Sequence, residues 1–229
     1  MKPKSLLRRT TYGLLGLLAA TYLGMGAYLA VQEPKLVYRP YKYPRGHYDK
    51  IHIAPPGQPG VQEHWLLSAD GGKLNAIYWH HEKPKGVLLF LHGNAGNVSH
   101  TIDELTYFYN KFSMSVMAVD YRGYGKSEGE PSEKGLYDDA RAAQKWLAEK
   151  ENVKPSEIVL VGRSMGGAVA TELATTIGAR ILVLWSTFNT LPAVGHFNYP
   201  FMPTDLIMKN RFASIDKIGK FHNPVISLH

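Results

Sequence analysis

Cysteine is absent from the 229 residues of this chain. The chain therefore forms no disulfide and no thiolate metal site, and it suits reducing and oxidising compartments equally.

Charge is absent between Thr10 and Val31, and a helix of that length, at about 1.5 Å per residue, spans a hydrocarbon core of about 30 Å. A basic tail, residues 1–9, precedes this run. The run is long for the apolar region of a signal peptide, and 27–30 (AYLA) is not an A-x-A cleavage site, so the sequence predicts a single uncleaved transmembrane signal anchor over 10–31.

A basic face of the kind that binds nucleic acid is lacking as well. The net charge is +7, but residues 1–50 hold nine basic and two acidic side chains, and residues 51–229 hold seventeen of each. The excess of positive charge therefore flanks the apolar run and is absent from the remainder of the chain. The sequence predicts a lipid bilayer as a partner through 10–31 and no nucleic acid. Basic residues on the two sides of the run nearly balance, so counting them does not decide the orientation.

A strand, a tight turn and a helix follow one another around Ser164. The apolar run 158–161 leads into Gly162-Arg163-Ser164-Met165-Gly166, and small residues then continue from Gly167. This is the context that a GxSxG nucleophile elbow requires, since glycines flank the serine where a Cβ would strike the neighbouring strand or helix. The pattern predicts Ser164 as a nucleophile. The alternative is a glycine-rich turn that holds a structural serine.

A second glycine-rich loop, His92-Gly93-Asn94-Ala95-Gly96-Asn97, follows the apolar strand 86–91. Acyl transfer needs preorganised N–H donors for the oxyanion that develops beside the nucleophile. We expect these donors to be the backbone N–H groups of Met165 and Asn94. His92 is expected to bond the loop backbone rather than to act as the base. The glycine spacing does not match G-x-G-x-x-G, which excludes a dinucleotide site.

One other motif imitates a nucleotide site. Gly125-Lys126-Ser127 resembles the end of a phosphate-binding loop, but Asp120 stands where the first glycine would be. Neither a cofactor nor a metal site is therefore expected. Asp120 is expected to organise the turn at 122–123. His80 and His81 are adjacent on a strand and point to opposite faces, which indicates solvated surface rather than a metal site.

Short apolar runs typical of strands alternate with segments of helical periodicity, which predicts one α/β domain over 61–229. A linker over 32–60 is expected to join this domain to the anchor. Its sheet should be mostly parallel and doubly wound, with an antiparallel first strand pair around the turn at 70–72. The expected strands are 63–69, 73–79, 86–91, 115–119, 158–161, 181–185 and 224–228, and the expected helices are 98–112, 132–150 and 167–177.

Five segments match a known family in that family's own order: 36–40 (LVYRP), 92–97 (HGNAGN), 120–129 (DYRGYGKSEG), 162–167 (GRSMGG) and 223–229 (NPVISLH). On these segments the chain resembles the α/β-hydrolase superfamily. Within it, the chain is similar to the membrane-anchored serine hydrolases that include Bem46 and the α/β-hydrolase-domain proteins 13 and 17. The resemblance implies an α/β-hydrolase fold. It also implies that the catalytic domain lies on the extracytoplasmic side.

The resemblance fails at the end of the chain. Family members place the triad aspartate and histidine after the segment that here ends at His229, so the chain is expected to be C-terminally truncated, without the last strand and helix. A replacement triad built from residues after Ser164 is not expected. The residues considered for one are Glu172, Asp205, Asp216, His196, His222 and His229.

Two functions remain open from the sequence. The first is a serine hydrolase that acts on carboxylic esters or thioesters through an acyl-enzyme, with acyl-chain substrates such as lipids or acylated proteins, and with little activity in the truncated form. An apolar segment around Phe201 and Met208 is expected to form a lid for such substrates. The second is a non-catalytic, membrane-tethered binding or scaffold protein with the same fold.

Overall fold

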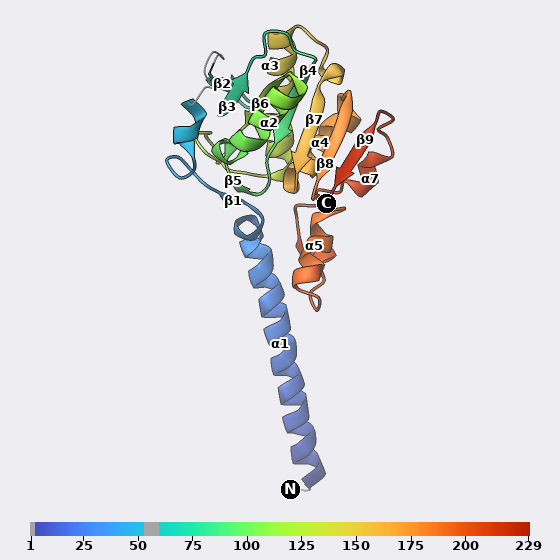
Figure 1. Ribbon diagram of the computed structural model, residues 1–229. Helices are drawn as coiled ribbons and strands as arrows, with labels where there is room; N and C mark the ends of the chain where they lie inside the picture. The colour runs from blue at the N-terminus through green and yellow to red at the C-terminus, as the bar shows by residue number, and fades with distance from the viewer. Residues whose placement is uncertain (1–2, 53–59) are drawn as a thin grey trace.

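A computed structural model describes residues 3–52 and 60–229 of the chain. One long helix, α1 (Pro3–Val37), projects from a domain in which helices cover a central sheet (Figure 1). The part of this helix from Arg8 to Val37 is apolar enough and long enough to cross a membrane by composition. The expected apolar N-terminal helix is thus present.

The sheet has seven strands in the order β2-β3-β6-β4-β7-β8-β9. β3 is antiparallel to both β2 and β6, and all the other pairs are parallel. The mixed sheet with antiparallel first strands confirms the fold class predicted from the sequence. The strands are β2 (Gln62–Leu67), β3 (Lys73–Trp79), β4 (Gly86–Leu91), β6 (Met114–Val119), β7 (Val159–Arg163), β8 (Ile181–Trp185) and β9 (Val225–Leu228).

Helices cover both faces of this sheet. Successive side chains of a strand point to opposite faces, so the continuous apolar strands place apolar side chains on both faces, and each face must be buried. In β4, Leu89 packs into the core beneath α3 (Glu133–Glu151) and α4 (Met165–Thr176). Its neighbour Phe90 packs into the second core, beneath α2 (Ile102–Phe112). The short 3-10 turns η2 (Val98–Thr101) and η3 (Pro155–Glu157) precede α2 and β7. Ser132 caps the N-terminus of α3, because its hydroxyl accepts the Gly135 N–H.

The segment after the apolar run differs from the linker that the sequence predicted. The helix α1 continues through Pro34 to Val37, and β1 (Arg39–Pro40) then pairs in parallel with β5 (Ala95–Gly96). A 3-10 helix, η1 (Tyr48–His52), follows. The helix continues because this stretch packs against the domain, which gives it partners that a free linker lacks. The turn-rich stretch expected at 55–60 lies almost wholly outside the described residues.

Three short helices follow β8: α5 (Leu191–Asn198), α6 (Thr204–Ile207) and α7 (Ile215–Ile218). We call residues 191–207 the lid hairpin. It leaves the domain on the side of α1 and runs beside that helix (Figure 1). The Tyr22 hydroxyl of α1 donates to the Phe201 carbonyl at 2.8 Å, and α1 also contacts α6. At the far edge of the sheet all four residues of β9 are exposed.

Candidate active site

Ser164 sits between β7 and α4 in a strained backbone conformation. Its φ is 54° and its ψ is −119°, a region that L-residues rarely adopt. Two hydrogen bonds to the backbone of Ser164 hold this conformation: its N–H donates to the Trp185 carbonyl at 2.9 Å, and its carbonyl accepts from the Thr187 hydroxyl at 2.8 Å. The serine is therefore fixed against β8 and stands at the N-terminus of α4.

Glycine is required on both sides of the serine because backbone approaches too closely for a side chain. A Cβ on Gly162 would overlap the backbone of Gly166 and Gly167, and one on Gly166 would overlap the carbonyl of Leu91. These separations fall below 3.0 Å, which real Cβ atoms essentially never show. The turn predicted as a nucleophile elbow thus has the close packing between strand and helix that such an elbow needs.

The loop after β4 lies directly against the serine. A Cβ built on Gly93 would stand 3.5 Å from the Ser164 Cβ. The carbonyl of Asn94 accepts the Arg39 N–H at 3.0 Å and the Tyr124 hydroxyl at 2.8 Å, while its side-chain amide donates to the Val37 carbonyl at 3.1 Å. Asn94 is therefore fixed by three hydrogen bonds, and its carbonyl and side chain are both bonded to groups other than the serine hydroxyl.

His92 is part of this scaffold rather than of the open site. It is buried, its Nδ1 lies 2.8 Å from the Gly93 carbonyl, and burial lowers its pKa to about 4. The neutral ring thus donates its Nδ1–H to the Gly93 carbonyl. Its Nε2 is 3.9 Å from Asp120 Oδ1, and His92 does not line the cavity that contains Ser164.

Asp120 is also structural, but it organises a different turn from the one expected. Its Oδ1 accepts the Val98 N–H at 2.8 Å, and its carboxyl also accepts the backbone N–H of Lys126. Burial raises the pKa of this carboxyl to about 7. Arg122, in the turn that the sequence assigned to Asp120, is instead held by Asp139, whose Oδ1 lies 2.7 Å from its Nη2.

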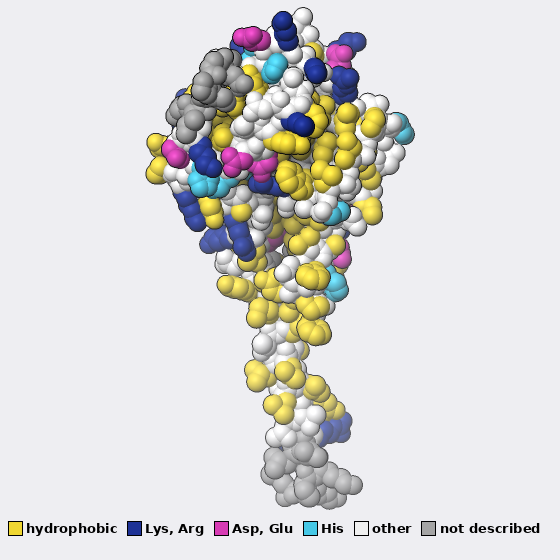
Figure 2. Space-filling model, in the orientation of Figure 1, with side chains coloured by type: hydrophobic (Ala, Val, Ile, Leu, Met, Phe, Trp, Pro, Cys, Tyr) yellow, Lys and Arg dark blue, Asp and Glu magenta, His cyan; other side chains and the backbone are white. Residues whose placement is uncertain are grey.

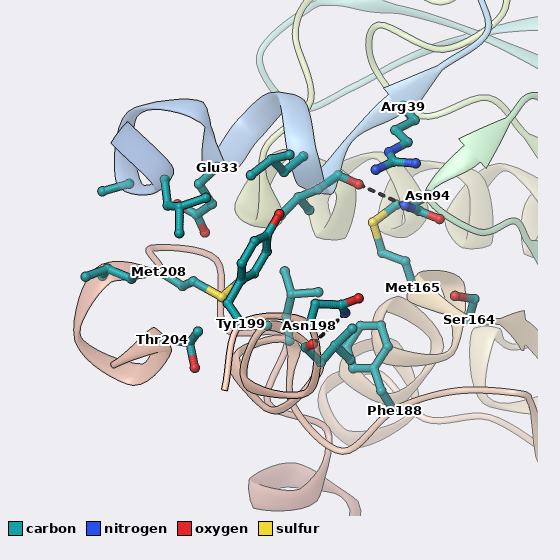
Figure 3. A pocket seen from close by; sticks show the side chains of 18 residues that line it. Glu33, Arg39, Asn94, Ser164, Met165, Phe188, Asn198, Tyr199, Thr204 and Met208 are labelled. Atoms are coloured by element: carbon teal, nitrogen blue, oxygen red, sulfur yellow. Dashed lines mark hydrogen bonds between the residues drawn. The ribbon is translucent and has the colours of Figure 1, made fainter. Parts of the chain in front are cut away.

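A cavity of about 390 Å³ opens over Ser164, with Asn94 and Met165 in its wall. The Ser164 side chain points into it past Met165 (Figure 3). The opposite walls come from α1, through Leu29, Ala30 and Glu33, and from the lid hairpin, through Val194, Asn198 and Tyr199. The site therefore joins four segments that lie apart in the sequence: the two glycine-rich loops, the end of the apolar helix, and the lid.

None of the residues considered for a replacement triad lines this cavity within the described part of the chain. His196, His222 and His229 are exposed. Glu172 pairs with Arg141 and Lys217, Asp205 pairs with Arg211, and Asp216 is exposed on α7. The described cavity thus presents a serine and candidate oxyanion donors but no histidine.

The carboxylate that does reach the cavity is Glu33, which sequence reasoning missed. It is buried and accepts the backbone N–H groups of Lys209 at 3.0 Å and Asn210 at 2.8 Å. The Asn210 side chain adds a third hydrogen bond to it. Glu33 thereby ties the end of α1 to the chain just beyond the lid hairpin. Its one sequence signal is its place as the first charge after the apolar run.

Comparison with known proteins agrees with this geometry. A sequence model of the family described as serine aminopeptidase, S33, matches residues 82–200. An uncharacterized protein of Mycobacterium tuberculosis is 34% identical over 224 residues, 97% of this chain and 77% of that protein. Protein bem46 of Schizosaccharomyces pombe is 34% identical over 185 residues, 79% of this chain and 61% of its own length.

Solved structures show the same architecture. The esterase Pf2001 of Pyrococcus furiosus matches with a TM-score of 0.62 at 19% identity, covering 82% of this chain and 76% of the esterase. At that identity the match shows the α/β-hydrolase fold. Together with the sequence matches it confirms the resemblance to the Bem46 group that the five motifs indicated.

Proposed function

The chain belongs to the α/β-hydrolase family whose model is described as serine aminopeptidase, S33, and on that premise we propose that it is a membrane-anchored serine hydrolase of acyl esters or thioesters. The observation that carries the proposal is the strained serine at the mouth of the cavity. Strain of this kind costs free energy and persists where the surrounding structure enforces it, which is typical of functional sites.

In this proposal the Ser164 Oγ attacks the carbonyl carbon of the ester and transfers its proton to a base. The carbonyl oxygen becomes an oxyanion, which accepts hydrogen bonds from the N–H groups of Met165 and Asn94. When the tetrahedral intermediate collapses, the base returns that proton to the leaving group, which departs as the alcohol or thiol and leaves an acyl-Ser164 enzyme. Water then gives a proton to the base and attacks the acyl group, and the base passes this proton to Ser164 as the acid product leaves.

We expect the 229-residue chain to turn over slowly. The described cavity holds no histidine to accept the serine proton, so Ser164 must react largely as a hydroxyl. When a triad lacks its base, the oxyanion hole and binding alone leave roughly 10³–10⁴-fold acceleration over water. Ordinary enzymatic turnover is therefore not expected of this chain by itself.

The walls of the cavity favour an acyl chain in the substrate. Leu29, Ala30, Val194 and Phe188 line it, and apolar walls with a few polar groups at the reacting end are typical of ligand pockets of this size. The apolar α1 helix, exposed along most of its length, supports a single membrane anchor. The domain is assigned to the extracytoplasmic side by analogy with the family alone.

The nucleophile is tested by a fluorophosphonate probe on the full chain. We expect slow labelling that Ser164→Ala abolishes and that Ser156→Ala, which changes an exposed serine outside the cavity, leaves intact. Equal labelling of the Ser164→Ala protein would place the nucleophile elsewhere. No labelling of the unmodified chain would favour the non-catalytic scaffold function.

The same variants test the absence of a base. Hydrolysis of p-nitrophenyl esters by the unmodified chain should stay near the rate of the Ser164→Ala protein. Fast turnover that Ser164→Ala removes would show that the chain supplies its own base, and His196→Ala and His222→Ala would then identify it. Anchoring is tested separately by carbonate extraction of membranes, from which the intact chain should not be released.

A further inference from the structure

The tip of the lid hairpin exposes large apolar side chains beside α1. Phe197 is 87% exposed, Phe201 is 86% exposed and Leu206 is 85% exposed. These values exceed those of the most exposed leucines of α1 itself, such as Leu23 at 70%. In the space-filling view, yellow side chains cover this part of the molecule where it narrows toward α1 (Figure 2). Large apolar side chains gathered in this way mark a surface that another apolar phase covers.

The hairpin lies beside the middle of the apolar run and not beside its end. The hydrogen bond from Tyr22 to the Phe201 carbonyl fixes this level. Tyr22 is nine residues before Val31, which is about 13 Å along the helix axis. If α1 spans a bilayer over its uncharged run, the tip of the hairpin must therefore lie within the hydrocarbon as well.

The composition of the hairpin suits that environment. No Asp, Glu, Lys or Arg occurs between Arg180 and Asp205. Asp205, on the returning arm of the hairpin, pairs with Arg211 at 3.2 Å. A charged side chain within hydrocarbon would cost free energy, so the absence of charge from the tip around Phe201 is consistent with insertion.

The backbone at the tip also has few groups that would require water. Pro200 and Pro203 have no N–H to satisfy. The N–H groups of Tyr199 and Met202 donate to carbonyls within the hairpin, and Tyr22 satisfies the Phe201 carbonyl. Unpaired backbone polar groups are costly in hydrocarbon, and these hydrogen bonds lower that cost at the tip.

We propose that the lid hairpin is a second membrane-inserted element beside α1, and that the cavity over Ser164 receives the acyl chain of a lipid ester directly from the bilayer. The cavity supports this route because α1 and the hairpin form its walls: Leu29 and Ala30 come from the last turns of the apolar run, and Tyr199 comes from the hairpin. The entry route rests on the proposed hydrolase function, whereas insertion of the hairpin does not.

The basic side chains mark the level of the headgroups. Lys and Arg gather where α1 meets the domain, above the narrow apolar part formed by α1 and the lid hairpin (Figure 2). Lys35 and Arg39 lie just beyond the apolar run, after Glu33, and Arg39 also lines the cavity. Basic residues at this position favour anionic headgroups. The reacting end of the substrate thus lies near the headgroups while its chain extends into the hydrocarbon.

Insertion can be measured without catalysis because the chain has no cysteine. A fluorophore that senses its surroundings is attached to a single introduced cysteine in the full chain, reconstituted in phosphatidylcholine vesicles. Phe201→Cys reports the tip, Leu23→Cys reports α1, and Glu149→Cys on the far end of α3 is the water-exposed control. Lipids with a spin label on the acyl chain should quench the emission at Phe201 and Leu23 and leave the emission at Glu149 unchanged.

Each result decides between named alternatives. Quenching at Leu23 without quenching at Phe201 overturns the insertion of the hairpin and leaves the anchor. Quenching at neither position overturns both. Emission at Phe201 that is shifted to the blue but not quenched by lipid overturns the proposal in favour of a protein partner or a second copy of the chain on this surface.

The route of the substrate is tested by labelling rates. Phe201→Asp places a carboxylate in hydrocarbon, so labelling by a long-chain fluorophosphonate dissolved in vesicles should fall on the order of tenfold. Labelling by a short, water-soluble phosphonate should not change. Leu67→Asp, at a 68% exposed leucine of β2, is the matched control and should change neither rate. Equal rates for Phe201→Asp and the unmodified chain in vesicles would overturn the route, whereas loss of both labels would point to the hydrolase function itself.

Discussion

The nucleophile turn and the lid hairpin form opposite walls of one cavity, and they are held in opposite ways. The turn is fixed by backbone packed on backbone, where no side chain fits at Gly162 or Gly166. The hairpin is held to α1 by Tyr22 and, just beyond its end, by Glu33, while its apolar tip is exposed. The reacting side of the site is therefore rigid. The substrate side depends on a few polar contacts and on what surrounds it.

The sharpest test of the rigid side is Gly166→Ala. The added Cβ would overlap the carbonyls of Leu91, the last residue of the central strand β4, and of His92 just after it, and this backbone cannot shift cheaply. We expect the free energy of unfolding to fall by about 3 kcal/mol, the upper end of the usual cost of overpacking. Chemical denaturation measures it.

Gly219→Ala is the matched control for this change. No atom lies within 4 Å of a Cβ built at Gly219, and its φ of −62° suits any residue. Its unfolding free energy should stay within about 0.5 kcal/mol of that of the unmodified chain. Equal effects at the two glycines would mean that the turn is not held by close backbone packing.

A pH titration sharpens the description of the scaffold beneath the serine. The folded-state pKa of Asp120 is raised to about 7, so its contribution to stability falls as pH rises from about 4 to about 7. The folded-state pKa of His92 is lowered to about 4, so its contribution rises with pH up to about 6.5. Between about pH 4 and about pH 6.5 the two contributions change with pH in opposite directions. The stability of the unmodified chain should therefore depend little on pH through this pair.

Asp120→Asn removes the contribution of Asp120, so the dependence of stability on pH that is due to His92 should become measurable. Relative to the unmodified chain, the variant should become more stable as pH rises from about 4 to about 6.5, by at most about 1.4 kcal/mol per pH unit. Urea denaturation at several pH values measures the difference. A difference that does not depend on pH would mean that Asp120 stays ionised when it is buried.

The smallest expected effect lies at the lid. In Glu33→Gln an amide replaces an acceptor of the Lys209 and Asn210 N–H groups. One lost charge-assisted hydrogen bond is worth about 1.5–3 kcal/mol where it is buried, and partial relaxation should reduce this to about 1 kcal/mol. Hydrogen exchange should therefore quicken at 191–211 and remain unchanged in β4 and β7.

Glu130→Gln, at an exposed glutamate, serves as the control for this substitution and should alter exchange in neither region. Faster exchange throughout the domain after Glu33→Gln would contradict the comparison, because it would mean that the lid and the turn open together.

The sequence was informative where structure depends on neighbours in the chain. The apolar period of 86–91 and 158–161 located the central strands, and the glycines around Ser164 located its turn. The sequence did not indicate contacts between residues that are far apart in the chain. The contacts of Glu33 with Asn210 and of Tyr22 with Phe201 join residues more than 170 positions apart, and no local pattern indicates them. For the same reason the pairing of β1 with β5 was missed, since a two-residue strand has no period to detect.

The pairing of β1 with β5 leaves almost no free chain between α1 and the domain. The helix ends at Val37, and Arg39 is already bonded to Asn94. A domain on a long flexible linker tumbles and samples its surroundings in three dimensions. This domain has no such freedom. With α1 in a membrane, the mouth of its cavity would keep a fixed orientation relative to the lipid surface. Its encounters with substrate would then be set by diffusion in a plane, and lateral mobility in the bilayer, more than affinity from solution, would govern how often they occur.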